Sequence, residues 1–157
     1  MKANIGISEG NSEAVADAMA KLLADEYVLY TKTRNAHWNV EGADFYDKHK
    51  LFESQFEQLN EIIDNVAERI RAIGHYATSS LQNFLNLTQL SEAKLEDNNS
   101  KTFIKDLLHD HESIIKYLRE NIIPFADDYK DLGTSDFITG LLEDHEKMAW
   151  FLRAHLK

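Results

Sequence analysis

The sequence predicts an all-α protein built as a four-helix bundle, with a long connection between its second and third long helices. Apolar residues recur every three or four positions over four long segments, and no stretch of useful length alternates apolar with polar residues. Only one proline and six glycines interrupt the 157 residues. A chain of this length is expected to fold as one domain with a substantial core.

The N-terminal part is expected to contain a short tail and the first long helix. Residues 1–10 have the composition of a flexible tail with a single lysine, Lys2, and residues 11–157 form the bundle domain. Asn11 or Ser12 is the expected helix cap, because a short polar side chain accepts a hydrogen bond from a free backbone amide. The apolar pattern then continues to about Trp38.

Glycines bound the second long helix, which is expected to start after Gly42 and to stop at Gly74. The connection that follows, residues 75–99, is longer than loops without structure of their own usually are. We therefore expect a short helix inside it, capped by Ser79 or Ser80.

The C-terminal part holds the third and fourth long helices. Ser100 is the expected cap of the third, and Pro124 should kink or end it because proline lacks a backbone donor. Gly133 then breaks the pattern, and Thr134 or Ser135 is the expected cap of the fourth helix. Four long helices with one long crossover match the arrangement of ferritin-like bundles.

Composition excludes several classes of function. Without cysteine the chain has no disulfide, no thiolate metal site and no cysteine nucleophile, which fits a reducing cytoplasm. No apolar run approaches the length of a membrane span, so we expect no membrane partner. The net charge of −10 opposes binding to nucleic-acid phosphates, and it favours either plain solubility or a surface that gathers cations.

Candidate metal ligands are concentrated in residues 35–73. Four of them fall along one stripe of the second helix, about 100° wide, that lies away from its apolar stripe. A fifth lies near the end of the first helix. In chain order the five are His37, His49, Glu53, Asp64 and Glu68.

The spacing of the four ligands on the second helix favours a site shared between two subunits. Glu53 and Asp64 are about 16 Å apart along the helix axis, so one helix cannot bring all four to one ion. However, the pairs His49/Glu68 and Glu53/Asp64 share one midpoint, near residues 58–59. A second copy of the helix, antiparallel about a two-fold axis there, would set the members of each pair opposite one another.

Several interpretations of these residues remain open from spacing alone. Imidazole and carboxylate ligands suit iron, zinc or manganese. The chain contains no Glu-x-x-His motif, which argues against the di-iron site that many ferritin-like proteins build inside one bundle. Without a metal, His49 and Glu53 would be a surface pair, Asp64 and Glu68 a solvated face, and His37 a packed histidine.

A longer pattern surrounds the candidate ligands. It reads His37-Trp38-Asn39-Val40-x-Gly42-x-x-Phe45-x-x-x-His49, followed by Phe52 and by Asp64-x-x-Ala67-Glu68-Arg69-Ile70. This pattern resembles the signature of the Dps family, the ferritin-like "DNA-binding proteins from starved cells" or miniferritins. Residues 133–152 also resemble the last helix of that family, so the resemblance covers essentially the whole chain.

The resemblance implies a function and assigns its residues. It implies a cytoplasmic, dodecameric hollow shell, built from two-fold dimers, that acts as a ferroxidase: it oxidises Fe²⁺ with hydrogen peroxide, less well with O₂, and stores ferric mineral. By position, His37, His49 and Glu53 come from one subunit, and Asp64 and Glu68 from its two-fold partner. Each site can take two iron ions, and zinc can substitute. Glu53 replaces the aspartate usual in the family, which moves the ligand oxygen outward by one methylene.

Other residues are expected to have supporting roles. Trp38 is expected either to accept stray oxidising equivalents or to pack at an interface. Glu57 and Glu61 lie on the ligand side of the second helix, where they would either nucleate ferric mineral or form a solvated face. The remaining histidines receive no ligand role, and His145 is expected at the surface. The acidic three-fold pores that the resemblance implies would use carboxylates around the turn before the last helix, namely Asp127, Asp128, Asp131 and Asp136.

Two other functions compete with iron oxidation. A nucleoid-compacting DNA-binding protein is the activity for which the family is named, and such contacts depend on lysine-rich tails. Here the first ten residues hold only Lys2, and the C-terminus ends with Arg153, His155 and Lys157, so we predict weak or absent DNA binding. A metal-free helical scaffold, in contrast, predicts no iron uptake.

Overall fold

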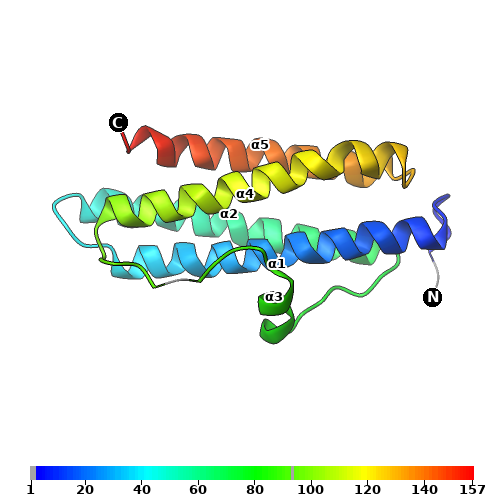
Figure 1. Cartoon of the computed structure of the whole chain (residues 1–157), viewed down its shortest axis with the longest axis horizontal. Coiled ribbons are helices and arrows are strands. Elements are labelled where there is room, and N and C mark those ends of the chain that lie inside the picture. The colour runs from blue at the N-terminus through cyan, green and yellow to red at the C-terminus, as the bar shows by residue number, and fades with distance from the viewer. Residues whose placement is uncertain (1–2, 93) are drawn as a thin grey trace.

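The chain is helical over most of the residues that the computed structural model describes, which are 3–92 and 94–157. In this part there are five helices and no strand (Figure 1), and the predicted all-α four-helix bundle with a short extra helix is confirmed. Lys2 lies outside the described residues. None of the described helices has an apolar stretch long enough to span a bilayer. The helices are α1 (Glu9–Asn39), α2 (Phe45–Ala72), α3 (Leu81–Leu87), α4 (Ser100–Asp127) and α5 (Leu132–Ala154).

The four long helices lie side by side, and the crossover runs along the outside of the bundle (Figure 1). α1 packs antiparallel against α2, and α4 packs antiparallel against α5. Because α2 ends at one end of the bundle and α4 begins at the other, the connection between them traverses its length. Partway along, α3 packs on α1 through the stacked rings of Tyr27 and Phe84, whose centroids are 4.6 Å apart.

An apolar core runs between the long helices, and it fixes the rotation of α2. Burial of each large apolar side chain contributes about 1.5–3 kcal/mol. The buried apolar residues of α2 recur every three to seven positions along one stripe, and the candidate ligand face points away from them. These residues are Phe52, Leu59, Ile62, Val66 and Ile70.

Two helix starts differ from the predicted caps. α1 begins at Glu9, because the Ser8 hydroxyl accepts the backbone N–H of Asn11 at 3.3 Å, so the caps predicted at Asn11 and Ser12 are wrong. α4 is capped by Asn99 rather than by Ser100. Ser100 is instead the first helical residue, and its hydroxyl donates to Asp44 Oδ2 at 2.7 Å, which ties α4 to the loop before α2.

The turn between α4 and α5 also departs from expectation. Pro124 does not end α4, which continues for a further turn to Asp127, and the Pro124 carbonyl accepts the backbone N–H of Asp128 at 2.9 Å. Gly133 lies inside the first turn of α5 rather than before it. The cap is Asp131, whose carboxylate accepts the backbone N–H of Thr134 at 2.9 Å.

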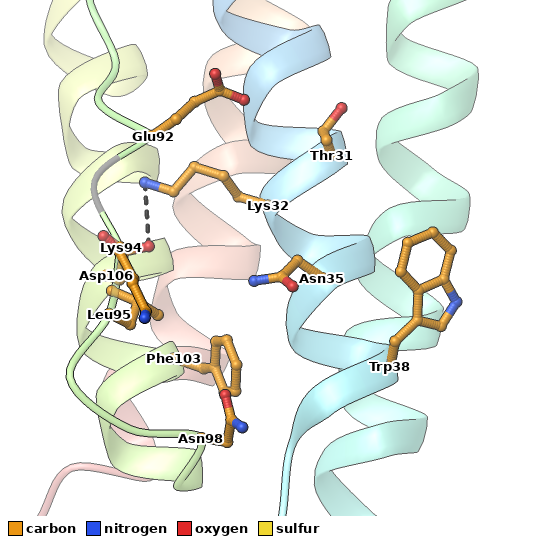
Figure 2. A pocket seen from close by; sticks show the side chains of 10 residues that line it. All are labelled: Thr31, Lys32, Asn35, Trp38, Glu92, Lys94, Leu95, Asn98, Phe103 and Asp106. Carbon is orange, nitrogen blue, oxygen red and sulfur yellow. Dashed lines mark ion pairs between the residues drawn. The ribbon is translucent and has the colours of Figure 1, made fainter.

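Lys32 of α1 fastens the crossover to the bundle. The Lys32 ammonium of α1 donates to the Ser91 carbonyl at 2.8 Å and pairs with Asp106 and Asp110 of α4, at 3.0 and 2.5 Å. Figure 2 shows Lys32 reaching from α1 toward Asp106, on the wall of a pocket of about 500 Å³ beneath the crossover. Trp38 lies on another part of the pocket rim, away from this ion pair.

Candidate metal centre

The predicted ligands His37 and His49 are brought together by the tight connection between α1 and α2. His37 lies in the last turn of α1, and His49 lies in the second turn of α2. Gly42, in the loop between the two helices, has φ +126°, a conformation that side-chain-bearing residues rarely adopt. The loop is also held to the start of α4, where the Glu41 N–H donates to the Asn98 carbonyl at 3.0 Å.

The two imidazoles form a reciprocal pair. His37 Nδ1 lies 2.9 Å from the backbone carbonyl of His49, and His49 Nδ1 lies 2.8 Å from the backbone carbonyl of His37. Their rings stack with centroids 3.8 Å apart and planes 20° from parallel. Two backbone carbonyls therefore hold both rings in one orientation.

This pairing selects the tautomer of both histidines. A carbonyl oxygen only accepts hydrogen bonds, so each Nδ1 must carry the proton that it donates. In a neutral imidazole the Nε2 lone pair is then free, and Nε2 is the nitrogen left to bind a metal. Metal-binding histidines usually donate their other ring nitrogen to a carbonyl or carboxylate in this way. The pair thus has the chemistry of two preoriented ligands.

Aromatic rings and one carboxylate surround the histidine pair. Phe56 meets the His37 ring edge-on, with centroids 5.1 Å apart, and Phe45 lies 5.2 Å from the His49 ring. Glu53 is partly exposed and accepts a hydrogen bond from the Lys50 ammonium at 2.6 Å. That bond and the charge of Lys50 hold the pKa of Glu53 below its usual value, and the two histidines act in the same direction. Glu53 is therefore an anion close enough to feel the charge of both histidines, and its carboxylate is held by Lys50.

The other two predicted ligands lie elsewhere in the subunit. Asp64 and Glu68 are exposed and lie farther along α2, toward its C-terminal end. In residues 3–92 and 94–157, no three His, Cys, Asp or Glu side chains converge as ligands for one ion. Within the described part of one subunit the five predicted ligands therefore do not form a metal site, and the shared site that the spacing predicts stays a prediction. Glu57 and Glu61 are exposed on the same helix.

The predicted pore carboxylates do not share one environment. Asp127, Asp128 and Asp136 are exposed around the turn between α4 and α5. Asp131 is buried, because its carboxylate caps α5 and accepts a hydrogen bond from Arg69 at 3.3 Å. We therefore remove Asp131 from the predicted pore set, since its charge is used inside the subunit.

A second titratable cluster, which the sequence analysis missed, lies in the middle of the bundle. His145 is fully buried rather than at the surface, so that prediction is wrong. Its Nε2 lies 2.8 Å from Glu26 Oε1 of α1, and its Nδ1 lies 3.0 Å from His111 Nδ1 of α4. Glu26 and His111 are also fully buried. Glu26, His111 and His145 therefore form a chain across three helices, which we call the core triad.

The core triad leaves two atoms without partners. Glu26 Oε2 and His111 Nε2 are buried and have no hydrogen-bond partner among the described residues. Burial, and secondarily the charge of His145, holds the pKa of His111 well below its usual value of 6.5. Periodicity does contain a signal for the triad, because each member lies three or four residues from core leucines of its own helix.

Comparison with known proteins defines the class. The ferritin-like domain family matches residues 16–157, and the chain belongs to that family. The solved structure of a Dps protein from Vibrio cholerae O1, described as a member of a superfamily of ferritin-like diiron-carboxylate proteins, is similar with a TM-score of 0.92. It is 29% identical, over 99% of this chain and 97% of that one. DpsC from Streptomyces coelicolor has a TM-score of 0.95 and 25% identity, over 100% and 91% of the two chains.

Within the ferritin-like family, the chain is a member of the Dps group. The DNA protection during starvation protein of Helicobacter pylori is 35% identical over 66% of this chain and 72% of that protein. DNA protection during starvation protein 2 of Bacillus anthracis is 32% identical, over 80% of this chain and 84% of that protein. The resemblance that the His37–His49 pattern suggested is therefore confirmed at the level of the family.

Proposed function

We propose that this protein is the subunit of a cytoplasmic, dodecameric iron-storage shell. It oxidises Fe²⁺ with hydrogen peroxide, and less well with O₂, at sites shared between two-fold-related subunits. The ferric product is stored as mineral inside the shell, which protects the cell from the oxidative damage that free Fe²⁺ and peroxide cause together.

The observation that carries the proposal is the reciprocal His37–His49 pair. Both rings are held by backbone carbonyls with Nε2 free, and Glu53 lies beside them with a lowered pKa. The two imidazoles are therefore oriented before a divalent cation binds, whereas Glu53 must leave Lys50 to join them. Two nitrogens and a carboxylate with open positions suit Fe²⁺, and zinc is expected to compete for them.

The proposed site is completed by the partner subunit. Asp64 and Glu68 are exposed on the same helix, and their spacing mirrors that of His49 and Glu53 about its middle. A two-fold axis at that point supplies both carboxylates to the histidine pair of the other subunit and generates two equivalent sites. The resulting set has three carboxylates and two imidazoles, enough for two iron ions.

The chemistry follows from the charge of this ligand set. Anionic carboxylates stabilise Fe³⁺ more than Fe²⁺, so oxidation is favoured where the ion is bound. Two ferrous ions in one site supply the two electrons that convert one peroxide into two hydroxide ions, and no hydroxyl radical is released. Trp38, beside His37, supplies an electron when only one ferrous ion is present.

The exposed acidic residues are assigned to iron entry and mineral growth. We assign Glu57 and Glu61, on the ligand side of α2, to nucleation of the ferric mineral. Asp127, Asp128 and Asp136 are assigned to pores that attract cations, in line with the net charge of −10. Both assignments depend on the dodecamer, whose interior and three-fold axes these residues would line.

Anaerobic Fe²⁺ loading followed by peroxide tests the proposal. The His37→Ala/His49→Ala variant is expected to assemble like the wild type but to lose rapid oxidation, measured as ferric absorbance in a stopped-flow instrument. The matched control is His109→Ala/His155→Ala, which removes two exposed histidines that are not part of the pair. Equally fast oxidation in assembled shells of the His37/His49 variant would refute the proposal.

Mixed shells test whether the ligands come from two subunits. Subunits carrying His49→Ala or Asp64→Asn are each expected to form inactive shells. When the two are unfolded together and reassembled, some interfaces regain one intact site, and about a quarter of the wild-type rate is expected for random pairing. No recovery in shells that mass spectrometry shows to be mixed counts against the shared site.

DNA binding is the alternative function, because several relatives carry DNA protection in their names. We propose that it is weak or absent here, since the net charge is −10 and the first ten residues contain one lysine. A gel-shift assay at neutral pH and physiological salt is expected to show no retarded band. Tight, salt-sensitive retardation would make nucleoid compaction the better description.

A further inference from the structure

The guanidinium of Arg34 lies among three aromatic rings near the histidine pair. Its central carbon is 4.5 Å from the ring centroid of Phe56, 5.0 Å from that of Trp38 and 5.7 Å from that of Tyr30. Arg34 also donates from Nη1 to the Tyr30 hydroxyl at 3.0 Å. Within the described part of the chain, no carboxylate forms an ion pair with it.

This cation is linked directly to the proposed metal centre. The Phe56 ring that Arg34 covers also meets the His37 ring edge-on. Trp38, which Arg34 also covers, is the residue next to His37 in the chain. The same charge therefore acts on the ring proposed as an electron donor and lies one ring away from a proposed ligand.

A positive charge over an aromatic face changes the ease with which that ring loses an electron. The neutral ring attracts the cation through its quadrupole, by about 0.5–1 kcal/mol at exposed sites. When the ring loses an electron it becomes positive, and attraction turns into Coulomb repulsion. Trp38 with Arg34 above it is therefore harder to oxidise than a tryptophan without a neighbouring cation.

We propose that Arg34 is a positioning residue that restrains Trp38 as an electron donor. The inference depends on the proposed function, because it concerns the electrons that peroxide receives at the metal site. With two ferrous ions bound, both electrons come from iron. With one ferrous ion, one electron comes from iron and one from Trp38, so that Fe²⁺, H₂O₂ and the indole give Fe³⁺, two hydroxide ions and an indole cation radical. Arg34 disfavours this second route and protects the ring.

The chain contains an internal reference for the test. Trp38 is 62% exposed and Trp150 is 59% exposed, so the two indoles are similarly accessible in the subunit. In the described residues, no arginine or lysine lies over the Trp150 ring, whose aromatic neighbour is Phe151 at 4.9 Å. The ratio of Trp38 to Trp150 oxidation therefore reports the effect of the cation and cancels differences in oxidant dose.

The experiment compares the wild type with Arg34→Gln and Arg34→Lys in assembled shells. Iron-free protein is exposed to a small one-electron oxidant, such as the azide radical, and peptide mass spectrometry measures oxidation of both tryptophans. We expect Arg34→Gln to raise the Trp38/Trp150 ratio about two- to fivefold, from the size of an exposed cation–π contact. Arg34→Lys, which keeps the charge, should restore at least half of the protection.

A matched control separates the effect from general loosening. Arg71 lies over the exposed Tyr76 ring, 4.4 Å from its centroid, on the far part of α2. Arg71→Gln should leave the Trp38/Trp150 ratio unchanged. An unchanged ratio in Arg34→Gln, or an equal rise in Arg34→Lys and Arg34→Gln, would overturn the inference.

A second arm separates this inference from the proposed function. One Fe²⁺ per site is added anaerobically, followed by peroxide, and Trp38 oxidation is expected to be higher in Arg34→Gln than in wild type. If no ferric iron forms in this arm while the ratio is still raised in the iron-free arm, the ferroxidase proposal is refuted and the effect of Arg34 on Trp38 stands. If Arg34→Gln leaves the Trp38/Trp150 ratio of the iron-free arm at the wild-type value, the proposed role of Arg34 is refuted, whatever the iron arm shows.

Discussion

We predict that His111 of the core triad makes the stability of this protein fall in mild acid. His111 is fully buried beside His145, and its pKa in the folded chain is well below 6.5 because burial disfavours the charged ring. In the unfolded chain the same imidazole takes up a proton near its ordinary pKa. The unfolded state therefore binds one more proton than the native state below that pH, and stability falls as the pH falls.

The size of this effect follows from linkage. A group that is protonated only in the unfolded state lowers the free energy of unfolding by about 1.4 kcal/mol for each pH unit below its unfolded pKa. Between about pH 7.5 and pH 5.5, His111 should therefore lower stability by about 1.4 kcal/mol per subunit. Burial raises the pKa of Asp110, although Lys32 opposes this shift. A carboxyl group with a raised pKa makes stability increase as the pH falls, which is opposite to the effect of His111. This contribution changes only at pH values above the ordinary 3.8 of an aspartate.

His111→Gln isolates the contribution of the buried imidazole. The amide cannot titrate, but it retains a donor and an acceptor for the ring of His145. Urea unfolding should be followed by circular dichroism at several pH values, with the protein concentration held constant because assembly shifts apparent stability. The wild type should lose about 1.4 kcal/mol more than the variant over the two pH units. Parallel pH dependences in the two proteins would show that His111 titrates normally in the fold, and the reasoning would fail.

Three further changes are expected to have measurable effects. Lys50→Gln removes the main cause of the lowered pKa of Glu53, so NMR of the side-chain carboxyl should show it titrating at a higher pH than in wild type, whereas Lys105→Gln should leave the titration unchanged. Asp131→Ala removes the α5 cap and the Arg69 pair and should cost about 1–2 kcal/mol in urea unfolding, with exposed Asp136→Ala as the near-neutral comparison. Gly42→Ala forces a side chain into φ +126° and should lower the free energy of unfolding by about 1–2 kcal/mol. Gly140 lies inside α5 with free space around a Cβ, so Gly140→Ala should raise the free energy of unfolding by up to about 1 kcal/mol in the same assay.

The helices were predictable because their signals are local. The apolar period, the glycines at positions 42 and 74, and the capping serine of the short crossover helix each act within a few residues, and all three match the structure. The caps of α1, α4 and α5 were misassigned because several adjacent polar residues can each cap a helix. At α4, for example, Asn99 caps the helix, while the Ser100 hydroxyl donates a hydrogen bond to Asp44, which is distant in the sequence.

The burial of individual polar residues is harder to predict from the sequence than the helices are. His145 lies among Glu143, Asp144 and Glu146, which gives it a polar neighbourhood in the sequence. Only the packing of α1 and α4 against α5 supplies Glu26 and His111 as partners that make burial tolerable. Asp131 is a similar case, because its burial depends on Arg69 of another helix.

Residue order alone was enough to predict the fold class, the family signature, and the stripe of ligand-type residues on α2 that lies off the core. These depend on residue order and helix period, which are properties of one chain segment. What those residues can do depends on how the helices pack. Only the close approach of His37 and His49 across the loop sets each Nδ1 on the other's carbonyl and leaves both Nε2 atoms free. Which atom of one segment meets which atom of another depends on how the two segments pack, and residue spacing along the chain does not specify this.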